Sequence, residues 1–346
     1  MNIIPIFIPH LGCPNDCVFC NQRSIASPFV PTKEDVQNTI KEALQYSKMP
    51  QIAYYGGSFT AIGTEKMTEY LSAAYEFIEK GLCKDIRVST RPDCINEEIL
   101  ALLKKYGVST IELGAQSMCE DVLLASKRGH TAQDVRDASQ MIKAHGFTLG
   151  LQIMTGLPLD SEEKSVYSAH EMVKCHPSMV RIYPVCVIDK TELADMMRSN
   201  AYSPISVDNS VETCAKLCGI FESNGIEVIR IGLNPTEELS NGAVLGGAYH
   251  PALGEMVRAR MMHNAICEKM DEITAESVII KINPKDVSIF GYFSVSFLYS
   301  ADFCPRNTET SFGFILIITL SAVISSIFSQ MALCIIRALT ISPRAG

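Results

Sequence analysis

The stretch IPHLGCPNDCVFCNQ (residues 8–22) carries three closely spaced cysteines, which directly follow a short apolar run, Ile3–Ile8. Cys13, Cys17 and Cys20 have the spacing C-x3-C-x2-C. Three thiolates this close together can hold three irons of a [4Fe–4S] cube and leave the fourth iron without a protein ligand. Such an iron can chelate the amino and carboxylate groups of S-adenosylmethionine, and one electron from the cube then releases a 5′-deoxyadenosyl radical.

Two other uses of these cysteines stay open. A structural zinc site prefers four ligands, and the nearby fourth candidate is His10. The thiols could also be inert and buried. A disulfide is disfavoured, because thirteen is an odd number of cysteines and the opening MNIIPIFIPH lacks the basic start of a secretory leader.

Length and charge bound the class of protein. The 346 residues suffice for one large α/β domain with an appendage. A net charge of −8 argues against a general nucleic-acid coat, although it allows a local basic patch. The remaining cysteines are scattered, which suits free thiols in a reducing compartment, so we expect a cytoplasmic protein.

Short apolar runs alternate with segments that open on good helix caps. The runs are Ile3–Ile8, Ile52–Tyr55, Ile86–Ser89, Thr110–Leu113, Leu149–Met154, Met179–Tyr183 and Ile226–Ile231, and the caps are Thr32, Thr64, Asn96, Thr131 and Asp160-Ser161. This alternation predicts a parallel sheet with helices outside, in a full or partial (β/α) barrel over residues 1–235. Residues 236–290 are expected to form a short C-terminal extension near a substrate mouth. A doubly wound sheet is the alternative, although no G-x-G-x-x-G opens a helix.

In a barrel, functional side chains collect at the C-terminal ends of the strands. Small, polar or turn residues follow six of the runs: the cysteine loop, Gly56-Gly57-Ser58-Phe59-Thr60, Arg91-Pro92-Asp93, Gly114-Ala115-Gln116-Ser117, Thr155-Gly156-Leu157-Pro158 and Pro184.

Individual residues of these ends have both functional and structural explanations. Gly57 leaves backbone accessible to a ligand, or simply makes a tight turn. Arg128 can pair a carboxylate, or lie at a solvated helix end. Gln152 interrupts an apolar strand and needs a partner if it is buried. Phe19 packs over the cluster or in the core.

Seven motifs, in this order, resemble the radical SAM superfamily: GCPNDCVFC, YYGGSFTAI, STRPD, ELGAQS, KRGHT, GLQIMTGLP and RIYPV. They are most similar to the bacterial branch related to the radical SAM half of the Elongator catalytic subunit. A similar set of loops occurs in oxygen-independent coproporphyrinogen III oxidases. The resemblance runs over about residues 1–260.

The resemblance implies an enzyme with a [4Fe–4S] cluster on Cys13, Cys17 and Cys20. It also implies that Gly57 and Ser58 contact the methionine part of S-adenosylmethionine. Around the adenosyl part it would place Gln116, Arg128 and Gln152.

The partners implied are a low-potential electron donor of the flavodoxin or ferredoxin type, and a tRNA or small-molecule substrate. No acetyl-coenzyme A loop is evident, so the Elongator reaction does not transfer directly. The alternatives are a coproporphyrinogen oxidase-like enzyme and a non-catalytic iron–sulfur or zinc protein.

The last part of the chain, residues 291–346, has a different composition. It holds only five charged residues, and none lies between Thr310 and Ile336. An uncharged stretch of this length can span a bilayer. Residues 310–336 are therefore a membrane contact, a buried segment, or the product of a reading frame lost near residue 290. In each case we expect this tail to carry none of the chemistry.

Overall fold

The structure is a computed structural model of the chain, and it divides into two compact units, Met1–Pro251 and Ala252–Gly346. The residues that it describes are 2–8, 13, 15–20, 30–233, 243–272, 277–282, 314–317 and 334–340. Each unit is described by itself.

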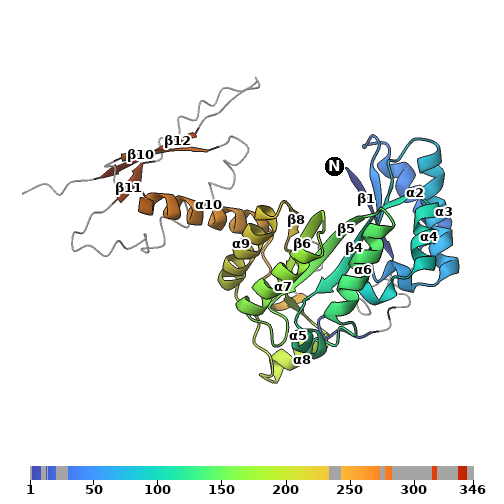
Figure 1. The fold of residues 1–346 in the computed structure, drawn as a ribbon, viewed down its shortest axis with the longest axis horizontal. Coiled ribbons are helices and arrows are strands. Elements are labelled where there is room, and N and C mark those ends of the chain that lie inside the picture. The colour runs from blue at the N-terminus through green and yellow to red at the C-terminus, as the bar shows by residue number, and fades with distance from the viewer. Residues whose placement is uncertain are drawn as a thin grey trace, which may run out of the picture. The chain divides into compact units, whose positions relative to one another are not determined.

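The first unit is built on a seven-stranded sheet in the order β1-β2-β3-β4-β5-β6-β8, and all neighbouring strands are parallel (Figure 1). Its strands are β1 (Ile3–Ile8), β2 (Gln51–Gly56), β3 (Ile86–Thr90), β4 (Val108–Gln116), β5 (Thr148–Thr155), β6 (Met179–Pro184) and β8 (Glu227–Ile231). The sheet curls, and since its edge strands β1 and β8 do not pair with each other, it forms a half-barrel and not a closed barrel. The predicted partial (β/α) barrel and all seven predicted strands are confirmed.

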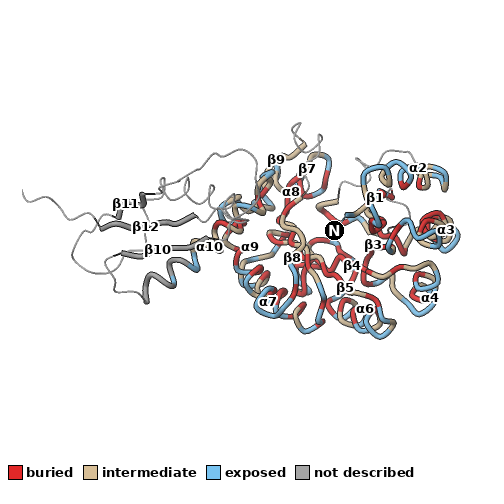
Figure 2. The backbone as a smooth tube through the Cα atoms, turned by 90° about the horizontal axis from the view of Figure 1, so that it is seen from above, coloured by how far each residue is buried: buried red, intermediate tan, exposed pale blue. Residues whose placement is uncertain are grey.

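Helices cover the convex side of this sheet (Figure 2). They are α2 (Lys33–Ala43), α3 (Thr64–Glu79), α4 (Glu97–Lys105), α6 (Ala132–Ala144), α7 (Glu162–Lys174) and α9 (Val207–Ser223). In β1 the alternate residues Ile4, Ile6 and Ile8 are buried, as expected for a strand with one face toward helices. The core therefore lies between the sheet and the helices.

Helix starts follow the predicted capping residues at four of five positions. Thr32 and Thr131 form complete capping boxes, and Asn96 and Ser161 each accept a hydrogen bond from a backbone N–H three residues on. The prediction for Thr64 is wrong, because Gly63 occupies the cap position and Thr64 is already helical. Gly63 has φ 89°, a conformation that glycine adopts without strain.

Short elements lie after the strands. Two 3-10 turns, η1 (Phe59–Ala61) and η2 (Pro92–Cys94), follow β2 and β3. The remaining elements of the first unit are the helices α5 (Glu120–Ala125) and α8 (Glu192–Arg198) and the antiparallel pair of β7 (Cys186–Ile188) with β9 (Val244–Gly247).

The second unit contains helix α10 (Leu253–Glu272) and an antiparallel sheet in the order β10-β12-β11. Its strands are β10 (Ser277–Ile282), β11 (Phe314–Ile317) and β12 (Cys334–Thr340). The boundaries predicted at residues 235 and 290 stay a prediction.

The predicted apolar tail is described only in part. Within residues 310–336 the structure describes β11 and the start of β12, and the rest of this stretch lies outside the described residues. Across the described ranges of the chain, no helix combines the length and the apolar character that crossing a membrane requires.

Candidate functional site

The three cysteines lie on the loop that follows β1, beside the carboxyl ends of the parallel strands. Cys17 is buried, whereas Cys13 and Cys20 are half-buried. The N–H of Cys20 donates to the carbonyl of Cys17 at 2.9 Å, which makes a tight turn between two of the thiols. The loop therefore brings one buried and two more accessible thiols to the functional end of the sheet.

Val18 anchors this loop to the protein. Its N–H donates to the carbonyl of Ser126 at 3.2 Å, and its carbonyl accepts from the N–H of Leu193 at 2.8 Å. The Val18 side chain is buried in a small apolar cluster, and Phe19 packs against that cluster. The packing role considered for Phe19 is thus present, and its role over a cofactor stays a prediction.

Arg128 lies directly beside the cysteine loop. Its Nη1 is 3.4 Å from Sγ of Cys17, and its Nη2 donates to the carbonyl of Gly114 at 2.7 Å. Its Nε is buried without a hydrogen-bond partner among the described residues. The guanidinium is therefore held between β4 and Cys17, with one donor still unused.

Arg91 supports Arg128 from the end of β3. It forms a two-point ion pair with Asp93, at 2.9 and 3.0 Å, and its Nη2 donates to the carbonyl of Arg128 at 2.6 Å. Asn15 of the cysteine loop donates to the same carbonyl at 3.4 Å. The sequence marked Arg91 as a strand-end residue but contained no signal for this supporting role.

Gly114 makes room for two of the predicted site residues. A Cβ on Gly114 would lie 2.8 Å from both Nη2 of Arg128 and Nε2 of Gln116. Gln116 itself has φ 68°, and its Oε1 is buried without a partner among the described residues. The structure therefore brings Gln116 and Arg128 together over the same glycine.

The glycine pair at the end of β2, Gly56 and Gly57, packs against the end of β1. Gly56 has φ 114°, and a Cβ there would lie 2.1 Å from the carbonyl oxygen of Ile8. Gly57 donates its N–H to that oxygen at 3.3 Å. This contact places the backbone of Gly57 next to the start of the cysteine loop.

Ser58 is less accessible than its motif suggests. Its hydroxyl lies 2.8 Å from that of Thr90, and it accepts from the N–H of Arg91 at 3.3 Å. The side chain is buried. Its hydroxyl therefore ties the segment after β2 to the end of β3, and the predicted contact of Ser58 with S-adenosylmethionine stays a prediction.

His130 is a buried histidine next to this site that sequence reasoning did not single out. Its Nε2 lies 3.1 Å from the carbonyl of Ala115, and since a carbonyl only accepts, Nε2 carries the proton. Burial, and then the positive charge of Arg128, lower the pKa of His130 from 6.5 to about 4. The imidazole is therefore neutral at physiological pH.

This shift predicts a pH-dependent loss of stability. Between pH 7 and pH 5 the unfolded chain binds a proton at this histidine that the folded chain does not, so stability falls as the pH falls. We expect His130 alone to lower the free energy of unfolding by about 2 kcal/mol between pH 7 and pH 5. Urea unfolding at pH 7 and pH 5 measures this change. The free energy of unfolding of His130→Gln should fall by about 2 kcal/mol less than that of the wild type.

The exposed His170 on α7 provides the control, as His170→Gln removes a histidine from the surface. If the wild type and His130→Gln lost the same free energy of unfolding between pH 7 and pH 5, His130 would not be the cause of the pH dependence.

Gln152 has the partners that its buried strand requires. Its Nε2 donates to Oγ of Ser89 at 2.9 Å and to Oε2 of Glu112 at 3.2 Å. Glu112 also accepts from Arg87 at 2.7 Å and from Arg181 at 2.6 Å. Because its nitrogen is anchored in this way, the amide of Gln152 keeps its carbonyl oxygen for a further donor.

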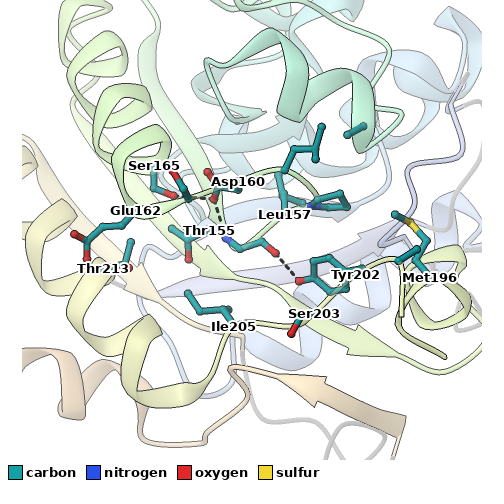
Figure 3. Close-up of a pocket in the computed structure, with 16 residues that line it drawn as sticks. Thr155, Leu157, Asp160, Glu162, Ser165, Met196, Tyr202, Ser203, Ile205 and Thr213 are labelled. Atoms are coloured by element: carbon teal, nitrogen blue, oxygen red, sulfur yellow. Dashed lines mark hydrogen bonds between the residues drawn. The ribbon is translucent and has the colours of Figure 1, made fainter. Parts of the chain in front are cut away.

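A cavity of about 590 Å³ lies at the end of β5, between the β5–α7 loop and the segment that joins α8 to α9 (Figure 3). Asp160 accepts from the N–H of Gly156 and from Ser165, both at 2.8 Å, and burial raises the pKa of Asp160. Tyr202 donates to the carbonyl of Gly156 at 2.5 Å. The predicted strand-end segment, residues 155–158, lines this cavity, whereas the residues predicted to hold the cluster and S-adenosylmethionine do not.

The donor set at the cysteine loop can be compared with the two kinds of metal centre considered. Among the residues that the structure describes, no three Cys, His, Asp or Glu side chains gather closely enough to hold one metal ion. Three thiols on one loop suit a multi-iron cluster, in which each thiol binds its own iron. His10, the fourth ligand considered for zinc, lies outside the described residues.

Two family models match the chain. The radical SAM superfamily matches residues 7–168, and the radical SAM C-terminal domain matches residues 177–263. The tRNA uridine(34) acetyltransferase of Methanocaldococcus jannaschii is 28% identical over 259 residues, which are 69% of this chain and 47% of that protein. Human Elongator complex protein 3 is 26% identical over 77% of this chain and 52% of its own length.

A solved structure shares the fold. A solved structure of archaeal Elp3 from Methanocaldococcus infernus superposes with a TM-score of 0.62 and 20% identity, over 81% of this chain and 70% of that chain. The chain spans about half the length of the curated relatives named above. On the two family models and these relatives, the chain belongs to the radical SAM superfamily and is an enzyme.

Proposed function

We propose that Cys13, Cys17 and Cys20 hold a [4Fe–4S] cluster with one open iron, and that the enzyme binds S-adenosylmethionine there to modify tRNA. The observation that carries this proposal is the contact between Arg128 and Cys17 at the carboxyl ends of the strands. A guanidinium beside a thiolate ligand stabilises the negative charge of such a centre.

Unpaired polar atoms support a ligand next to this centre. Oε1 of Gln116, Nε of Arg128 and Nη1 of Arg91 are buried without partners among the described residues. Buried polar atoms normally have partners, so these three indicate a missing polar ligand. S-adenosylmethionine carries an amino group, a carboxylate and ribose hydroxyls, which complement one acceptor and two cationic donors.

A cluster held by Cys13, Cys17 and Cys20 would supply one electron, which would cleave S-adenosylmethionine to methionine and a 5′-deoxyadenosyl radical. The backbone of Gly57 lies at the cysteine loop, where it would bind the methionine part. Arg128 and Gln116 would orient the ligand over Gly114, and Gln152 would accept a hydrogen bond from it. Phe19 would shield the centre from water. A flavodoxin or ferredoxin type of donor would supply the electron.

The substrate class comes from the relatives. One relative's name specifies uridine 34 of tRNA, and we propose that this chain also acts on a tRNA uridine. Acetyl transfer is not carried over, because the matched part spans 47% of that protein.

The test uses full-length protein, purified and reconstituted with iron and sulfide without oxygen, then reduced with dithionite. We expect about four irons per chain, formation of 5′-deoxyadenosine from S-adenosylmethionine, and more of this product when tRNA is added. Mass spectrometry measures 5′-deoxyadenosine, and a colorimetric assay measures iron.

Two cysteine variants make the result specific. Cys17→Ala should lose the cluster and the product, whereas Cys83→Ala, which alters another buried cysteine, should keep both. Equal activity of the two variants would refute the cluster site. A Cys17-dependent product that tRNA neither increases nor alters would refute the substrate class alone.

A further inference from the structure

The concave face of the half-barrel carries aromatic and cationic side chains. Tyr54 faces the helices, because its hydroxyl donates to the carbonyl of Tyr70 in α3 at 2.5 Å. Successive strand residues point to opposite faces, so Tyr55 lies on the concave face, away from the helices that Figure 2 shows.

An aromatic pair begins this row of side chains. Phe7 of β1 is directly paired in register with Tyr55 of β2, and the centroids of their rings are 6.4 Å apart. Phe7 is 66% exposed, although phenylalanine is normally buried. A large apolar ring exposed next to another ring is suited to stack with a planar ligand.

Arginine continues the row. The guanidinium carbon of Arg181 lies 5.4 Å from the centroid of the Tyr55 ring, and Nη2 donates to the Tyr55 hydroxyl at 2.9 Å. Arg230 of β8 is paired in register with Arg181 of β6. Its positive charge also reaches Tyr183, where it opposes the burial that raises the pKa of that hydroxyl. Aromatic side chains of β1 and β2 thus lie on the same face as an arginine and a tyrosine of β6 and an arginine of β8.

This face has more positive than negative charge at its centre. Glu112 is 1% exposed and accepts hydrogen bonds from both Arg87 and Arg181, so two guanidiniums share one carboxylate. Arg230 of the neighbouring strand adds a third cation. The exposed Glu227 lies at the start of β8, three residues before Arg230. A surplus of cations in a chain of net charge −8 favours an anionic ligand on this face.

We propose that Phe7, Tyr55, Arg181, Tyr183 and Arg230 form a binding strip for a single-stranded segment of RNA. A base stacks on Phe7 and Tyr55, and the neighbouring phosphodiester binds Arg230. Single-stranded RNA is recognised through base stacking on aromatic rings combined with arginine contacts to the backbone. A small carboxylate would explain the arginines but would leave Phe7 exposed. This inference rests on the proposed action on tRNA and names the residues that would hold the RNA.

The experiment measures RNA binding by the reconstituted full chain. The probe is a fluorescein-labelled anticodon stem–loop with uridine at the position corresponding to tRNA position 34, and fluorescence anisotropy gives its affinity at several salt concentrations. Arg230→Gln should weaken binding roughly tenfold or more and make the plot of log affinity against log salt shallower by about 0.7. Phe7→Ala should weaken binding roughly tenfold.

Matched controls remove the same groups elsewhere. Arg136→Gln removes one positive charge from α6 on the convex side, where Arg136 pairs with Glu171. Tyr46→Ala removes an aromatic ring that is 89% exposed beyond the end of α2. Both should bind the probe as the wild type does, and circular dichroism should give all four variants the wild-type melting temperature within a few degrees.

Several outcomes would overturn the strip. They are no measurable binding by the wild type, unchanged binding by Arg230→Gln and Phe7→Ala, or equal weakening by the controls. Because anisotropy is measured without S-adenosylmethionine, any of these could coincide with normal formation of 5′-deoxyadenosine. The proposal of an RNA-binding strip can therefore be refuted while the proposal of radical chemistry is supported, and the reverse outcome is also possible.

Discussion

Replacing Glu112 by alanine is expected to destabilise the protein by about 3–5 kcal/mol. Its carboxylate is the shared partner of two guanidiniums, at 2.7 Å from Arg87 and 2.6 Å from Arg181. Removing it leaves two charges inside the half-barrel without a counter-ion, which costs more than the original pair contributes. The free energy of urea unfolding at pH 7 measures this loss.

The pH dependence of the wild type should agree with this role. Burial alone would raise the pKa of Glu112, but hydrogen bonds and charge from Arg181 and then Arg87 outweigh it and lower the pKa. A carboxyl with a lowered folded pKa contributes stability that is present above its unfolded pKa of about 4.3 and is lost as the pH falls below it. The acid-induced loss should therefore be smaller in Glu112→Ala than in the wild type.

Two further variants isolate the cause. Glu192→Ala removes an exposed carboxylate that pairs with Lys127, and it should cost less than about 1 kcal/mol. The triple change Arg87→Met, Glu112→Leu, Arg181→Met removes the whole buried group and should recover most of the stability. If Glu112→Ala cost no more than Glu192→Ala, the charges would not be buried as described.

Replacing Gly56 by alanine is expected to cost about 2–4 kcal/mol, because two penalties coincide there. The residue has φ 114°, and the new Cβ would lie 2.1 Å from the carbonyl oxygen of Ile8. The backbone of β1 or β2 must move, at the point where β1 leads into the cysteine loop. Thermal unfolding should occur roughly 5–10 °C lower, and reconstitution should retain less iron.

Gly63 separates the two penalties. It also has a positive φ, 89°, but nothing lies within 4 Å of the Cβ that alanine would add. Gly63→Ala therefore carries only the backbone strain, about 1 kcal/mol. Equal losses from Gly56→Ala and Gly63→Ala would mean that β1 moves aside without cost.

Elements set by nearby residues were predictable from the sequence. The seven strands were found because each is an apolar run of a few residues, and four helix starts because a capping side chain bonds within three positions of itself. The prediction of a cap at Thr64 was wrong for an equally local reason, since Gly63 occupies the cap position. The cysteine loop was evident because its three thiols lie within eight residues.

Contacts between strands depended on the tertiary structure. The sequence predicted that Gln152 needs a hydrogen-bond partner if it is buried. It did not predict that Glu112 is such a partner, because Glu112 lies 40 positions away in the chain. Arg181 and Glu112 are 69 positions apart, and Arg128 and Cys17 are 111. The pairs between strands form only once the register of the parallel strands is set, and that register depends on packing of the whole sheet. Arg128 meets Cys17 only once the loops that carry them lie together at one end of the sheet. By itself the sequence determined the alternation of elements and the cysteine spacing, while folding decided which polar side chains meet.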